Sequence, residues 1–223
     1  HLGRLLSFAI MTGEATVVKN AGSHFMLSLL PEWNPFPAVL KGRVRLKSSE
    51  ATNPVAVGDR VRFETDMDDA ADITLTHPAL ITEVLDRKNY VIRKSTNLSR
   101  QSHVIAANID MAFAVVTLYF PEIKLPFLDR MLVTCEVYGV PVTIVMNKVD
   151  LYGKEAPEAV DNFINIYTKA GYRVVQASAK TGEGIDGLRS ICDGKVCLFS
   201  GESGVGKSSL IKALDPSLDP KTG

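Results

Sequence analysis

Near the end of the chain, one segment combines the residue types that hold a polyphosphate: Gly201-Glu202-Ser203-Gly204-Val205-Gly206-Lys207-Ser208. Glycines let the backbone wrap closely around an anion, so that successive N–H groups and the N-terminus of a following helix point at it. Lys207 supplies a positive charge for the β and γ phosphates, and the Ser208 hydroxyl supplies one ligand to Mg²⁺. The segment, which we extend to Ser209, predicts a phosphate-binding loop for a magnesium-bound nucleotide.

A second motif, Asn147-Lys148-Val149-Asp150, follows an apolar run and has the chemistry to recognise guanine. The Asp150 carboxylate can accept two hydrogen bonds from the N1–H and 2-amino groups of guanine, which adenine does not offer. A site built for those donors rejects the wrong base, because its acceptor would be left unpaired. We expect Asn147 to brace the neighbouring loops and the Lys148 stem to cover the base.

Ser178-Ala179-Lys180 follows the next apolar run and would complete base recognition. The backbone N–H of Ala179 would donate to guanine O6, and the Lys180 stem would pack on the opposite face of the base. Each of the three motifs follows its own predicted strand, where open α/β sheets bind ligands. Guanine nucleotide is therefore the favoured ligand, with a P-loop ATPase or kinase as the alternative.

The elements that must position these loops alternate between strand and helix from about residue 101 onward. Apolar runs predict strands at 109–118, 141–146, 172–176 and 195–200, and amphipathic patterns predict helices at 127–139, 156–170, 185–191 and 207–214. Alternation of this kind indicates a parallel sheet with right-handed crossovers. We assign residues 104–223 to an α/β P-loop NTPase domain.

The order of the motifs is inverted relative to an ordinary GTPase domain, in which the phosphate loop precedes both base-recognition loops. The domain is therefore predicted to be circularly permuted, a change that exposed connections tolerate. Its switch segments should follow residue 214, yet no Asp-x-x-Gly follows the phosphate loop up to Gly223. We interpret the domain as truncated before the switches and name no catalytic residue, because the water-positioning residue is expected beyond the chain.

Residues 12–103 instead carry short alternating runs typical of β structure, at 15–18, 24–29, 39–46, 59–64 and 79–84. Five short strands predict a small barrel; an OB-fold is favoured, and an SH3-like barrel fits nearly as well. Basic residues at every second position from 41 to 47 should share one strand face, and a second basic group follows. The predicted RNA-binding residues are Lys41, Arg43, Arg45, Lys47, Arg87, Lys88, Arg93 and Lys94; a solvated outer face is the alternative.

Composition limits the classes of partner and the cellular location that the chain can have. The chain has 223 residues with 25 basic and 25 acidic side chains, so net charge argues neither for nor against a nucleic-acid partner. Three scattered cysteines favour a reducing cytoplasm, and no apolar run approaches the roughly 20 residues of a membrane span. We expect a cytoplasmic monomer, and we interpret residues 1–11 as a possible remnant of an expression vector.

Taken together, the motifs resemble the RsgA/YjeQ family of circularly permuted bacterial GTPases, from about Gly13 to Gly223. The stretches that carry the resemblance are Thr52–Asp59, Ala106–Asp110, Asn147–Asp150 and Gly201–Ser209. It implies an N-terminal OB-fold that binds rRNA, GTP hydrolysis stimulated by the small (30S) ribosomal subunit, and a role in late maturation of that subunit.

The family also has a C-terminal zinc-binding domain, so Zn²⁺ is expected only there, outside this chain. Because the switches are missing too, the resemblance does not carry hydrolysis over to residues 1–223 alone. A non-hydrolysing, guanine-nucleotide-dependent RNA-binding module is therefore the alternative function.

Overall fold

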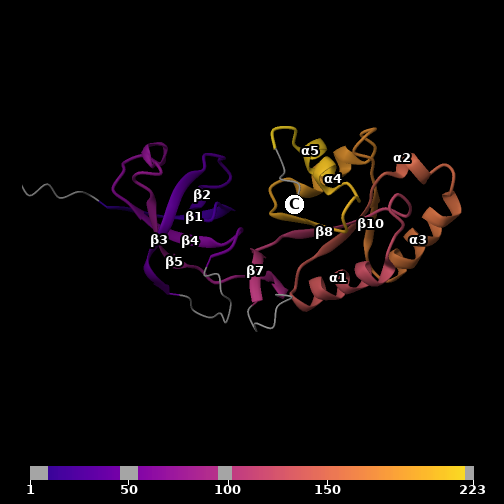
Figure 1. Ribbon diagram of the computed structural model, residues 1–223, viewed down its shortest axis with the longest axis horizontal. Helices are drawn as coiled ribbons and strands as arrows, with labels where there is room; N and C mark the ends of the chain where they lie inside the picture. Colours follow the sequence, from indigo (N-terminus) through magenta and orange to yellow (C-terminus); the bar gives the residue numbers. More distant parts are fainter. Residues whose placement is uncertain (1–9, 46–54, 95–101, 219–223) are drawn as a thin grey trace, which may run out of the picture. The chain divides into compact units, whose positions relative to one another are not determined.

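A computed structural model describes residues 10–45, 55–94 and 102–218. The chain divides into two compact units, His1–Asn108 and Ile109–Gly223 (Figure 1). The sequence-based boundary lay between residues 103 and 104, within a strand of the first unit, Ser102–Ala107.

The first unit contains a closed five-stranded barrel with the order β1-β2-β3-β5-β4. Its strands are β1 (Met11–Asn20), β2 (Phe25–Ser28), β3 (Phe36–Arg45), β4 (Arg60–Thr65) and β5 (Ala79–Val84), with the 3-10 turn η1 (Ala70–Asp72) between β4 and β5. Only the β3–β5 pair is parallel among the barrel pairs. The five predicted strands are all present, and the architecture agrees with the predicted OB-fold.

Period-two alternation builds the barrel core. In β4, Val61 and Phe63 are buried while Arg60 and Arg62 are exposed, and the rings of Phe36 and Phe63 pack 5.2 Å apart. In β3 the alternation is interrupted, because Gly42 has φ +54° and the register against β5 shifts between Leu40 and Arg45. The backbone of β3 therefore does not support strict alternation of side chains from Lys41 to Arg45, and Lys47 lies outside the described residues.

A hairpin of β6 (Tyr90–Lys94) and β7 (Ser102–Ala107), which was not predicted, completes the first unit. The backbone N–H of Ala107 donates to the carbonyl of Val57 at 2.9 Å, beside the barrel. Gly58 is required here: its φ is +93°, and a Cβ atom would lie 1.9 Å from the Ala107 carbonyl oxygen.

A buried ion pair stands next to this junction. The Asp59 side chain is fully buried and accepts hydrogen bonds from Nε and one terminal nitrogen of Arg87, both at 2.7 Å, and from the N–H of Ala56 at 2.8 Å. The hydrogen bond to Asp59 raises the pKa of the Arg87 guanidinium. The pair clamps the start of β4 to the segment that follows β5.

The second unit is built on a parallel sheet with the order β10-β9-β8-β11. Its strands are β8 (Met111–Val116), β9 (Val142–Met146), β10 (Arg173–Gln176) and β11 (Cys197–Ser200). Its helices are α1 (Leu125–Val137), α2 (Val149–Tyr152), α3 (Pro157–Lys169), α4 (Ile185–Cys192) and α5 (Lys207–Leu214). Every predicted element is present, and the single turn α2 is an addition.

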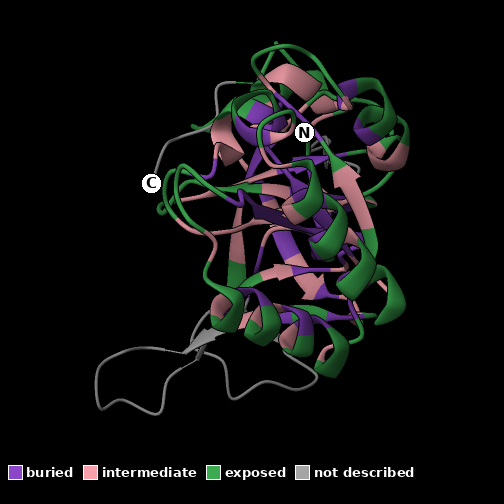
Figure 2. Cartoon of the chain, turned by 90° about the vertical axis from the view of Figure 1, so that its right-hand side faces the viewer, coloured by how far each residue is buried: buried purple, intermediate pink, exposed green. Residues whose placement is uncertain are grey.

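Two hydrophobic clusters cover the two faces of this sheet. One joins Ala114 and Ile144 to helices α1 and α3, and the other joins Phe113 and Val145 to helices α4 and α5. Figure 2 shows buried strands enclosed by helices whose outer faces are exposed. None of the helices in the described ranges is long and apolar enough to cross a membrane.

Candidate nucleotide-binding site

The three predicted loops leave the carboxyl ends of β9, β10 and β11, at one edge of the parallel sheet. Strand-end hydrogen bonds hold the first two in register: Asn147 N–H donates to the Val116 carbonyl, and Ala177 N–H to the Met146 carbonyl, both at 2.8 Å. The N–H of Val149 in turn donates to the carbonyl of Ala177 at 3.2 Å. The sheet thus brings together segments that are far apart in the sequence.

The phosphate loop turns on two glycines with positive φ, Gly204 at +83° and Gly206 at +91°. Gly206 caps the N-terminus of α5, so the first N–H groups of that helix are available to an anion. The Lys207 ammonium donates to the carbonyls of Gly201 and Glu202, both at 2.7 Å, and burial lowers its pKa. Ser208 is half-buried at the start of the helix. The arrangement has the backbone geometry and the positive charge expected of the predicted phosphate-binding loop.

The segment Asn147–Asp150, called the base loop below, forms hydrogen bonds directly to the phosphate loop. Lys148, at φ +61°, donates from Nζ to the Gly204 carbonyl at 2.6 Å and to the Phe120 carbonyl at 2.9 Å. Asn147 donates from Nδ2 to the Val205 carbonyl at 2.9 Å. A Cβ atom at Gly206 would lie 2.5 Å from Asn147 Nδ2, so only glycine fits there. The two loops form one structure.

One buried acceptor in this structure has no partner. Asn147 is 1% exposed, and its Oδ1 lacks a hydrogen-bond partner among the described residues. Leaving a buried polar atom unsatisfied costs about 1–3 kcal/mol. An unsatisfied atom where the base loop meets the phosphate loop fits a site completed by a bound polar ligand or its water.

Asp150 is oriented by the third loop. The fully buried Ser178 donates from Oγ to Asp150 Oδ1 at 2.7 Å and accepts from the N–H of Thr181 at 3.1 Å. Asp150 itself is exposed, as is Lys180, whereas Ala179 is half-buried. Ser178 therefore fixes the direction of a carboxylate that faces solvent.

Sequence reasoning missed several supporting residues. Tyr152 is buried and donates to the Asn147 carbonyl at 2.5 Å, and burial raises the pKa of its phenol to about 12. Lys124 forms an ion pair with Glu202 at 3.0 Å. No motif marks these residues. The Lys124–Glu202 contact arises from the sheet order, which places β8 and the segment after it beside β11, and Tyr152 reaches Asn147 through the single turn α2.

The predicted RNA-binding residues differ in their ion pairing and in whether their side chains are described. The guanidinium of Arg87 is committed to Asp59, and Lys41 forms an ion pair with Glu64 at 2.5 Å. Lys88 is exposed. Arg43, Arg45, Arg93 and Lys94 lie in β3 and β6, but their side chains are outside the description, and Lys47 is outside the described residues.

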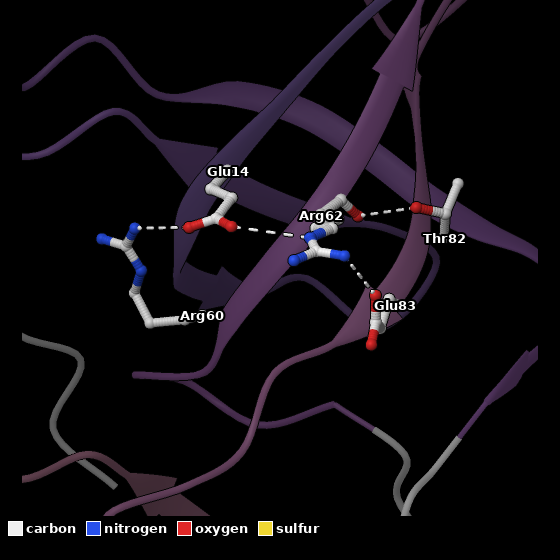
Figure 3. Close-up of polar contacts among 5 residues, drawn as sticks. All are labelled: Glu14, Arg60, Arg62, Thr82 and Glu83. Carbon is white, nitrogen blue, oxygen red and sulfur yellow. Dashed lines mark hydrogen bonds and ion pairs between the residues drawn. The ribbon is translucent and has the colours of Figure 1, made fainter.

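On the outer face of the barrel, charges alternate across three strands (Figure 3). Glu14 on β1 lies 3.4 Å from Arg60 and 3.5 Å from Arg62, both on β4, and Arg62 lies 3.1 Å from Glu83 on β5. Exposed pairs of this kind contribute roughly 0–1 kcal/mol each. Their main effect is to neutralise Arg60 and Arg62. Neither arginine is among the predicted RNA-binding residues.

Comparison with known proteins agrees with this geometry. The family model described as RsgA GTPase matches residues 84–223. A small ribosomal subunit biogenesis GTPase RsgA from Bacteroides fragilis is 46% identical over 206 residues, which are 92% of this chain and 64% of that protein. The protein of the same name from Flavobacterium psychrophilum is 40% identical, covering 95% of this chain and 60% of that protein. The chain thus spans somewhat less than two thirds of the length of these curated relatives.

Solved structures give the same result. The crystal structure of YjeQ from Thermotoga maritima is 31% identical with a TM-score of 0.75, covering 96% of this chain and 68% of that one. YloQ, described as a circularly permuted GTPase, is 24% identical with a TM-score of 0.67, covering 93% of this chain and 66% of that one, a likeness of fold. The predicted resemblance is confirmed: the chain belongs to the RsgA GTPase family.

Proposed function

We propose that the chain binds guanine nucleotide through its three loops and that the whole protein hydrolyses GTP in biogenesis of the small ribosomal subunit. The observation that carries the nucleotide proposal is the bracing of the phosphate loop by Lys148 and Asn147, at 2.6 and 2.9 Å. It joins a candidate base site to a candidate phosphate site in one rigid structure. The names of the relatives support the biological role.

Each loop residue has a proposed task. Asp150, held by Ser178, accepts from the guanine N1–H and 2-amino groups, and the Ala179 N–H donates to O6. Lys207 and the N-terminus of α5 hold the β and γ phosphates. With nucleotide bound, Mg²⁺ would be held by the Ser208 hydroxyl and phosphate oxygens, where it neutralises phosphate charge. The proposed nucleotide-binding set is residues 147–150, 178–180 and 201–209.

Base selectivity tests the nucleotide proposal. Asp150→Asn replaces an acceptor with an amide donor facing the guanine N–H groups, so GDP affinity should fall by about 100-fold or more. Xanthosine diphosphate, which carries an oxygen in place of the 2-amino group, should bind the variant better than GDP does. The control is Asp161→Asn, an exposed carboxylate on α3. If Asp150→Asn leaves the nucleotide preference of the protein unchanged, Asp150 does not select guanine, and a P-loop ATPase or kinase becomes the better description.

Hydrolysis is tested on the full-length protein. GTP turnover should rise when small ribosomal subunits are added, and Lys207→Ala should abolish it because the phosphate charge loses its partner. If subunits cause no stimulation while GTP still binds, the non-hydrolysing RNA-binding module is the better description.

We also propose that the barrel unit contacts rRNA, as OB-folds often bind oligonucleotides. The basic set retained is Lys41, Arg43, Arg45, Lys47, Lys88, Arg93 and Lys94. Arg87 is omitted because its guanidinium is held by Asp59. Lys88→Glu should weaken binding to a ribosomal RNA fragment and reduce its salt dependence, whereas Arg62→Glu, on the charge-compensated face, should change it less. Equal effects would refute this placement. We also propose that the protein acts in the cytoplasm as a monomer. Zn²⁺ is not proposed for residues 1–223.

A further inference from the structure

The strand pairing brings three segments of the first unit to one end of the barrel. β1 starts at this end, where Met11 pairs with Thr65, the last residue of β4. β2 runs toward the same end, antiparallel to β1, so its connection to β3 lies there too. The connection from β4 to β5 completes the set, because β5 starts beside the start of β3. We call residues 10–11, 29–35 and 66–78 the β4–β5 end of the barrel.

Large apolar side chains are exposed on all three segments of this end. Trp33, on the connection from β2 to β3, is 62% exposed, and Leu75, on the connection from β4 to β5, is 66% exposed. The other exposed members are Ile10, Met11, Leu29 and Leu30. A single exposed apolar side chain is ordinary, but several of them gathered at one place on a protein mark an interaction surface.

Hydrogen bonds hold both connections in a fixed conformation. The fully buried Ser28 donates from Oγ to the Glu32 carbonyl at 2.8 Å and closes a turn after β2. Thr74 and His77 exchange backbone hydrogen bonds of 3.1 and 3.3 Å around a turn that contains Leu75. A surface that is already ordered loses less entropy when a partner binds. The two connections thus present their apolar side chains from a preorganised backbone.

The charges at this end have one sign. Its two connections contain no lysine or arginine and five acidic residues, all of them exposed: Glu32, Asp66, Asp68, Asp69 and Asp72. None of these carboxylates forms an ion pair with another residue that the structure describes. Because β3 and β5 both start here, Lys41 in β3 and Lys88 after β5, which are proposed for RNA, lie toward the opposite end.

This charge excludes RNA as the favoured partner of the β4–β5 end. The connection from β4 to β5 often contacts oligonucleotides in OB-folds, but carboxylates repel the phosphates on which such binding depends. Exposed apolar side chains among carboxylates instead suit a protein surface that carries both cations and apolar groups.

We propose that the β4–β5 end of the barrel docks on a lysine- and arginine-rich protein surface of the small ribosomal subunit. Trp33 and Leu75 pack against apolar side chains of that surface, and the carboxylates around them pair with its cations. An aromatic anchor inside a polar rim is typical of protein interfaces, and opposite charges on the two partners set the orientation and select against wrong partners. The choice of the small subunit as the source of this partner rests on the proposed function.

Photocrosslinking of the full-length protein tests the proposal. p-Benzoylphenylalanine is introduced in place of Trp33 in one variant and in place of Lys88 in another, and each variant is irradiated with purified small subunits and a slowly hydrolysed GTP analogue. Mass spectrometry should find position 33 joined to a lysine- and arginine-rich peptide of a ribosomal protein. Position 88, on the basic side of the barrel, should be joined to rRNA.

Substitutions measure how much the surface contributes to binding. Trp33→Ser combined with Leu75→Ser should weaken cosedimentation with small subunits by about tenfold or more, and Asp68→Lys should weaken it and alter its salt dependence. The matched control is Glu14→Lys, which reverses the same charge on the neutralised face of the barrel (Figure 3) and should change binding by less than about twofold. Circular dichroism shows that each variant is folded.

Several results would overturn the proposal. They are crosslinks from position 33 to rRNA, to an acidic peptide or to a second copy of the chain, and the absence of any crosslink at position 33 while position 88 still reaches rRNA. These results leave the proposed function intact. If the unmutated protein does not sediment with small subunits at all, the ribosomal part of the proposed function fails, and this docking fails with it.

Discussion

Arg87→Ala should destabilise the first unit severely, because it removes the partner of a buried charge. The Asp59 side chain is fully buried and the Arg87 side chain is 14% exposed. Two hydrogen bonds of 2.7 Å join them, and the substitution would leave the Asp59 carboxylate with only the Ala56 N–H among its hydrogen-bond partners given by the structure. The effect therefore comes from an uncompensated anion in the protein interior rather than from lost surface charge.

The expected magnitude follows from measured buried pairs. Removing one partner of such a pair costs about 3–5 kcal/mol. For a unit of roughly 100 residues, each kcal/mol lowers Tm by about 4 °C or more, so the barrel should melt some 12–20 °C earlier. Asp59→Ala combined with Arg87→Ala removes both charges and should cost less than the sum of the single substitutions.

Urea denaturation would measure these effects, followed by circular dichroism and by the fluorescence of Trp33, the only tryptophan, which lies in the barrel unit. Arg62→Ala is the matched control, because its arginine is exposed and forms only surface ion pairs; it should cost less than about 1 kcal/mol. If Arg87→Ala leaves the free energy of unfolding within 1 kcal/mol of the parent while weakening RNA binding, Arg87 acts on RNA as the sequence suggested, and the structural argument fails.

Three further predictions concern the second unit. Gly206→Ala should abolish measurable GDP binding in a fluorescent-nucleotide titration, because the alanine Cβ would collide with Asn147 Nδ2. The control is Gly171→Ala: this glycine also has a positive φ, but a Cβ atom there would have no neighbouring atom within 4 Å, so the variant should bind GDP normally. Lys148→Ala removes the hydrogen bonds to the Gly204 carbonyl of the phosphate loop and to the Phe120 carbonyl, leaving Asn147–Val205 between the loops. It should lower GDP affinity by about tenfold, the equivalent of roughly 1.4 kcal/mol; unchanged affinity would show that the bracing by Lys148 is dispensable. The pKa of Tyr152 rises from 10 to about 12 in the folded chain, so its protonated form stabilises the fold below pH 10, and this contribution disappears as pH rises toward 12. Tyr152→Phe should therefore flatten the loss of stability in alkaline urea titrations, and a parallel shift of the whole curve would contradict the assignment.

Local pattern was enough to predict most elements of this fold. The strands and helices of the second unit follow from apolar runs and amphipathic periodicity, since each element buries one recognisable face. The three loops proposed to bind nucleotide were also predicted from sequence, because the chemistry of phosphate and guanine demands particular residue types at fixed spacing; the structure places these loops at the carboxyl ends of β9, β10 and β11.

What the sequence could not supply are relations between distant segments. Arg87 was grouped with exposed cations because nothing in its neighbourhood indicates Asp59, a residue 28 positions earlier. The sequence predicted alternating side chains in β3 on both sides of Gly42. This prediction was wrong, because the presence of a glycine does not reveal whether its φ is positive. Tyr152 acts on the base loop through a single turn, α2, that is too short to have a periodicity.

The hydrogen bonds of Lys207 bear on the entropy of ligand binding. A free lysine side chain carries about 2 kcal/mol of rotamer entropy, which a ligand that immobilises it must normally overcome. Here two of the three ammonium N–H groups already donate to Gly201 and Glu202, leaving one for a phosphate oxygen. The side chain is thus ordered when the loop folds, and an incoming phosphate meets a cation that is already immobilised.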